Sequence, residues 1–195
     1  MNIKHSILAS LYFPLRFQNI IRKRFKSQYS PRLRVLLYHN IDQIDESQFS
    51  TQMKWLKKTW KFIDLAEFES ILDGKLNIME DSILLTFDDG FLSNRKVVEN
   101  ILNPLSIKAL FFVISDFIDL DYKGDFRQFI SNGIFPLMAL ESIPDHWRNM
   151  NWDDLKFLLD SGHSIGAHTA THAKLSDLSN KELQKEVVDL SLIHI

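Results

Sequence analysis

The chain has 195 residues, of which 45% are hydrophobic and 25% are charged, and this ordinary globular composition excludes a wholly disordered, collagenous or coiled-coil chain. The absence of cysteine excludes disulfide scaffolds, thiolate metal sites and cysteine nucleophiles. The net charge of −2 hides an asymmetry, because residues 1–35 hold eight Lys/Arg and no acid, whereas residues 36–195 hold 15 basic and 25 acidic residues. We therefore separate a basic segment, residues 1–32, from an acidic body, residues 33–195, whose charge argues against a nucleic-acid partner.

The basic segment carries apolar residues at helical spacing from Ile3 to Phe25, with Lys and Arg between them. This pattern predicts an amphipathic helix that bends at Pro14 and is too short and too basic to span a bilayer. We favour binding of residues 1–30 to an anionic membrane surface, which would place the chain at a membrane or in the cell envelope. A helix that packs on the body, an export signal and a cytoplasmic location are the alternatives.

From Arg34 onward, short apolar runs alternate with segments of helical spacing. The runs predict four buried strands, at residues 35–38, 83–87, 109–114 and 164–167. Helices are expected between them and after the last strand, with Asn151 as one N-cap and a capping box at Ser179–Glu182 as another. Strands separated by helices indicate βαβ units and a mainly parallel sheet, either open or closed into a barrel. Residues 119–150 predict a long structured loop or insertion beside a site.

Titratable side chains follow three of the four predicted strands. His39 follows the first strand, Asp88 and Asp89 follow the second, and His168 follows the fourth. Because loops converge at the carboxyl ends of parallel strands, we expect these side chains to lie in one region. His39 is there expected to contact substrate, and the alternative is a histidine held by local hydrogen bonds. His163 is interpreted as part of the strand structure.

The segment 168–172 places His168 and His172 four residues apart. If this segment begins a helix or forms a tight turn, both rings can reach one cation, and Thr169 is expected to fix the loop by a hydrogen bond to nearby backbone. Two histidines and one carboxylate leave coordination positions open, which is typical of a catalytic metal. Asp88 and Asp89 are adjacent and diverge, so one can bind the cation while the other stays free as a base.

The segments TFDDG at residues 86–90 and HTATH at residues 168–172, together with VLLYHNI at residues 35–41, resemble the polysaccharide deacetylases, the NodB-homology group or carbohydrate esterase family four. The resemblance covers about residues 33–190. It implies a distorted (β/α) barrel that removes acetyl groups from N-acetylated sugars of a polysaccharide or oligosaccharide.

The resemblance also implies roles for individual residues. By position, Asp88 corresponds to the catalytic base of that family, and Asp89, His168 and His172 correspond to its metal ligands. Zinc is the expected divalent cation for such ligands, and cobalt, nickel, manganese and iron suit similar sites.

Motifs of that family that follow the second histidine are missing here: an arginine, a Pro-Tyr, a tryptophan with an acidic residue, and a Leu-x-His. Only 23 residues follow His172, so we expect an incomplete barrel of about four strands, truncated at its C-terminus, with an incomplete catalytic apparatus. Such a barrel exposes an unpaired strand edge, which predicts weak stability. A non-catalytic carbohydrate-binding protein and a membrane-associated interaction protein, both retaining the metal cluster, are the alternatives to an enzyme.

Overall fold

The computed structural model describes residues 30–120 and 125–188. Leu33–Ile195 forms a compact unit of its own. The predicted amphipathic helix of residues 3–25 lies outside the described residues. Within the described ranges, no helix has the length and apolar character needed to cross a membrane.

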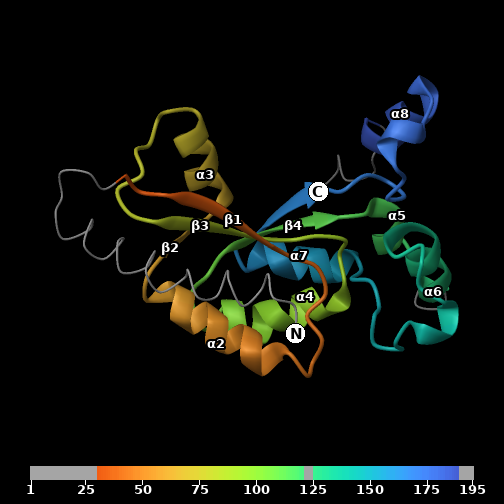
Figure 1. The fold of residues 1–195 in the computed structure, drawn as a ribbon, viewed down its shortest axis with the longest axis horizontal. Coiled ribbons are helices and arrows are strands. Elements are labelled where there is room, and N and C mark those ends of the chain that lie inside the picture. Colours follow the sequence, from red (N-terminus) through yellow and green to blue (C-terminus); the bar gives the residue numbers. More distant parts are fainter. Residues whose placement is uncertain (1–29, 121–124, 189–195) are drawn as a thin grey trace, which may run out of the picture. The chain divides into compact units, whose positions relative to one another are not determined.

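A parallel sheet forms the centre of the body (Figure 1). Its strands are β1 (Leu33–Tyr38), β2 (Lys61–Ile63), β3 (Ser82–Phe87), β4 (Ala109–Val113) and β5 (Ser164–Ala167). Every residue of β3 is buried. β1 pairs along its whole length on one side, β2 and β4 share the other side, and helices cover its two faces. β5 pairs with β4, so β1 and β5 form the two ends of this sheet in the described part of the chain.

All four predicted strands are present, and the α/β fold with a parallel sheet is confirmed. The sequence prediction missed β2, a fifth strand that follows β1 in the chain and pairs with β3 on the side away from β1. β2 has only three residues, and a run this short shows no measurable periodicity in the sequence. It is a strand because its backbone meets the first half of β3.

Helices cover both faces of the sheet (Figure 1). The longer ones are α2 (Glu46–Lys57), α3 (Leu65–Leu72), α4 (Leu92–Val97), which continues as the π-helix η2 (Val98–Leu102), α7 (Trp152–Asp160) and α8 (Asn180–Val187). Apolar side chains of α2, α4 and α7 pack on one face around Phe87 and Phe111, and those of α3 pack on the other face around Leu84. The predicted N-caps Asn151 and Ser179 both form capping boxes.

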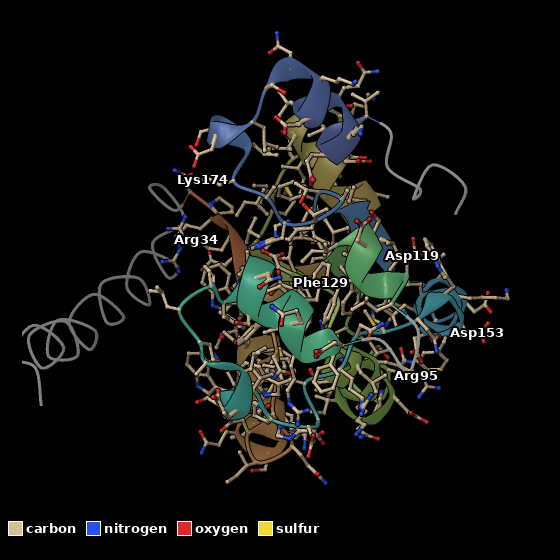
Figure 2. The ribbon with its side chains drawn as sticks, turned by 90° about the vertical axis from the view of Figure 1, so that its right-hand side faces the viewer. Arg34, Arg95, Asp119, Phe129, Asp153 and Lys174 are labelled. Carbon is tan, nitrogen blue, oxygen red and sulfur yellow. The ribbon has the colours of Figure 1, made fainter. Side chains whose placement is uncertain are left out.

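Residues 119–150 form more regular structure than the predicted loop. The segment includes α6 (Phe126–Phe129), the π-helix η3 (Ile130–Ile134) and the 3-10 helix η4 (Leu140–Ser142), and α5 (Ser115–Ile118) precedes it. Side chains of these short helices form a second apolar cluster, in which Phe117 and Phe129 stack with ring centroids 5.0 Å apart. Figure 2 labels Phe129 in this region. In the sequence, the apolar residues of this segment show no sustained helical period, which is why the sequence predicts a loop. The shared apolar cluster and contacts with distant residues, such as that between Trp147 and Asp42, support the short helices.

Candidate metal centre

The end of β3 presents two buried carboxylates. Asp88 and Asp89 follow the last strand residue, and only 8% and 1% of their surfaces are exposed. The Asp88 amide donates to the Tyr38 carbonyl at the end of β1, which continues the strand pairing. Asp89 and Gly90 then take positive φ angles of 75° and 96°. The positive φ of Gly90 lets the backbone turn sharply directly after the two carboxylates.

The two histidines lie in a tight turn after β5. The His168 amide donates to the Val113 carbonyl over 2.9 Å, so the histidine is anchored to the neighbouring strand. Thr169 and His172 have positive φ angles of 66° and 64°, which form a turn rather than a helix. The Thr169 Oγ1 accepts a 3.0 Å hydrogen bond from the His172 amide. Thr169 therefore bonds to backbone within the ligand loop, as expected from the sequence.

Asp89, His168 and His172 come together at the carboxyl ends of the strands. Asp89 Oδ1 lies 3.6 Å from His168 Nε2 and 3.8 Å from His172 Nε2. Ligand atoms bound about 2.0–2.1 Å from one tetrahedral ion are about 3.3 Å apart. The three side chains therefore stand at close to the separation that a shared cation requires, and one ligand atom from each lies within 4.8 Å of the others.

The ring of His172 is held in the tautomer that suits a ligand. Its Nδ1 lies 2.9 Å from the carbonyl oxygen of Gly133 in η3. Since a carbonyl only accepts hydrogen bonds, Nδ1 carries the proton and the lone pair of Nε2 is free toward Asp89. A helix of the 119–150 segment thus orients one of the two histidines.

Two carboxylate oxygens at this centre are buried without a hydrogen-bond partner among the described residues, Oδ1 of Asp88 and Oδ2 of Asp89. Burial raises the pKa of the Asp89 carboxyl, and electrostatic interactions with His39, His172 and His168 oppose that increase. A buried carboxylate without a full set of partners is costly, and a cation next to it would remove that cost. The donor set and the orphaned oxygens both fit a divalent cation.

The remaining histidines fall into four groups. His39 is exposed, and its influence on Asp89 puts it in the same strand-end region; its contact with substrate stays a prediction. His163 is buried and bonded to the Ala109 amide and to Asn103, so its interpretation as part of the strand structure is confirmed. His146 contacts Asp42, a partner that the sequence did not indicate. His5 and His194 lie outside the described residues.

Two residues near the centre were not predicted from the sequence. Gly133 supplies the carbonyl that orients His172, and Glu186 of α8 bonds to the loop between the two histidines. A lone glycine and one glutamate in a polar helix carry no motif, so no signal in the sequence marked them.

Comparison with known proteins supports one family. The family model described as polysaccharide deacetylase matches residues 75–191. The protein YxkH of Bacillus subtilis (strain 168), whose name refers to the polysaccharide deacetylases, is 24% identical over 170 residues, which are 84% of this chain and 52% of that protein. The chain thus spans about half the length of this relative.

Solved structures share the fold. The deacetylase PplD of Streptococcus pyogenes superimposes with a TM-score of 0.62 at 18% identity, covering 83% of this chain and 67% of that one. BC0361 of Bacillus cereus, described as a polysaccharide deacetylase, gives a TM-score of 0.58 at 23% identity, with 82% of this chain and 45% of that one covered. IcaB of Ammonifex degensii gives 0.56 at 23% identity, with 78% and 58% covered.

Proposed function

Because this chain belongs to the polysaccharide deacetylase family, we propose that Asp89, His168 and His172 hold one divalent cation in a domain that removes acetyl groups from N-acetylated sugars. The observation that carries the proposal is the buried Asp89 carboxylate facing the Nε2 atoms of both histidines at 3.6 and 3.8 Å. The chain spans about half of its relative, so the acetyl-removing activity is proposed for the whole protein.

The side chains at this centre supply complementary chemistry. A bound divalent cation polarises an acyl carbonyl and lowers the pKa of a water molecule. Among the described residues, no group hydrogen-bonds to Oδ1 of Asp88, the neighbour of Asp89, and this oxygen can accept the proton of an attacking water. His39 is exposed at the end of β1 and is available to contact the sugar. Two histidines and a carboxylate favour zinc, with cobalt, nickel, manganese and iron as further candidates.

Metal content tests the centre directly. The full chain, loaded with Zn²⁺ and then dialysed to remove unbound metal, should retain about one ion per molecule. His168→Ala and His172→Ala should each lose this ion. His146→Ala is the matched control, because that histidine is exposed and bonded to Asp42 instead of Asp89. If the two ligand variants keep the ion as well as the control does, the site is wrongly assigned.

Asp88→Asn separates the base from the ligands. In a preparation that releases acetate from an N-acetylated oligosaccharide, this variant should lose at least about 100-fold in rate, the usual contribution of a general base, and should retain the metal. Unchanged acetate release would remove Asp88 from that role. Glycan binding with no acetate release by any preparation would favour a non-catalytic carbohydrate-binding protein.

Membrane binding by residues 1–30 is part of the proposal only as a prediction from the sequence. Flotation of the full chain with anionic liposomes should depend on these residues and weaken as salt is added. Equal flotation after deletion of residues 1–30 would refute membrane binding by this segment.

A further inference from the structure

Glu186 is a charged side chain that α8 buries. Only 8% of its surface is exposed, although its neighbours along the helix are exposed. Glutamate is seldom buried unless its carboxylate is paired or hydrogen-bonded. The position of this carboxylate therefore calls for a specific set of partners.

Those partners lie in the loop between the two candidate metal ligands. Oε2 of Glu186 accepts hydrogen bonds from the Thr171 amide at 2.9 Å and from the Ala170 amide at 3.1 Å. Oε1 accepts a 2.7 Å hydrogen bond from the Thr171 hydroxyl. A single carboxylate thus binds three donors from two consecutive residues, and charge makes each of these bonds stronger than a neutral one.

The loop needs such an anchor because its backbone is strained at both ends of the contact. Thr169 before it and His172 after it have positive φ angles, and non-glycine residues stay in that region only when their surroundings hold them there. Figure 1 shows α8 beyond the carboxyl ends of β4 and β5, on the side where this loop leaves the sheet. Glu186 therefore connects α8 to the segment that carries His168 and His172.

We propose that Glu186 is a positioning residue that sets the cation affinity of the centre by fixing the ligand loop. This inference rests on the proposed function, since it assumes that the two histidines bind a metal. The hydrogen bonds of Glu186 go to backbone and hydroxyl groups of residues 170–171, so it acts on the ligands through the loop.

Zinc affinity tests the proposal, measured on the full chain by competition with a chromophoric chelator. Glu186→Ala removes all three acceptor contacts and should weaken Zn²⁺ binding about 10–100-fold, the usual effect of losing a group that orients metal ligands. Glu186→Gln should recover most of the loss, because its amide oxygen can accept from both backbone amides. The absorption spectrum of the Co²⁺-loaded chain should change in the alanine variant and return toward wild type in the glutamine variant.

Glu182→Ala is the matched control. Glu182 lies on the same helix and accepts from the Ser179 amide and hydroxyl in the capping box, so its truncation weakens the start of α8 and leaves the ligand loop intact. Its zinc affinity should equal that of wild type. Equal losses in Glu182→Ala and Glu186→Ala would assign the effect to helix stability and overturn the proposal.

Two further results keep the outcomes separate. If Glu186→Ala does not fold, Thr171→Val replaces it, because this variant removes only the hydroxyl bond to Oε1 and should weaken zinc binding about threefold; no weakening overturns the proposal. A wild-type chain that binds no zinc refutes the proposed function itself. Tight binding by wild type together with equal binding by Glu186→Ala refutes only the role of Glu186.

Discussion

Acidification should destabilise the sheet through His163, which precedes β5. Only 4% of this residue is exposed. Nδ1 accepts a 3.1 Å hydrogen bond from the Ala109 amide, so the proton lies on Nε2, which donates to Asn103 Oδ1 over 3.2 Å. Burial, with a smaller contribution from the positive charge of Lys108, lowers the pKa of His163 from 6.5 to about 4.

The sign and size of the effect follow from proton linkage. The unfolded chain takes up the proton near pH 6.5 and the folded chain only near pH 4, so His163 contributes stability above pH 6.5 that is lost progressively as the pH falls toward 4. Between about pH 7.5 and about pH 5, this difference lowers the free energy of unfolding by about 2 kcal/mol.

Urea unfolding of wild type and His163→Asn at the two pH values isolates this contribution. Asparagine can offer its carbonyl to the Ala109 amide and does not titrate, although it loses the edge contact of the ring with Phe111. The variant should be less stable at pH 7.5 and should lose about 2 kcal/mol less than wild type on acidification, since other titrating groups act on both chains. Equal losses in the two proteins would refute a neutral, buried His163.

Three further substitutions test the packing that supports the centre. Gly90→Ala should destabilise the chain by about 2 kcal/mol or more in urea unfolding, because its φ is 96° and the new Cβ would lie 2.9 Å from Ile118 Cδ1; wild-type stability would contradict this packing. Gly133→Ala puts a Cβ 3.1 Å from the Thr171 carbonyl oxygen, so zinc affinity should fall several-fold. Unchanged affinity would show that the loop of residues 168–172 can shift without disturbing the metal ligands. Asn151→Ala removes a capping box and should cost about 1 kcal/mol in thermal unfolding; an unchanged midpoint would show that the cap contributes nothing.

The sequence by itself determined the main strands of the sheet and the residues at their carboxyl ends. Apolar runs predicted β1, β3, β4 and β5. The titratable residues that follow three of these runs predicted which side chains meet at the carboxyl ends. These are local patterns, because strand burial and helix capping depend on residues within one element and its ends. The two motifs around Asp89 and His168 could be recognised in the sequence for the same reason. The assignment of Asp89, His168 and His172 as metal ligands stays a prediction that metal content tests.

Tertiary structure decided how those ligands are held. The contacts of His172 with Gly133, of Glu186 with Thr171 and of His163 with Ala109 join residues 39, 15 and 54 positions apart. The three-residue β2 and the short helices of 119–150 are likewise stable only against distant partners. Hydrophobic periodicity in the sequence cannot predict such long-range contacts. A glycine or a glutamate would suit many exposed positions, and only the folded chain brings each of these residues to its hydrogen-bond partner.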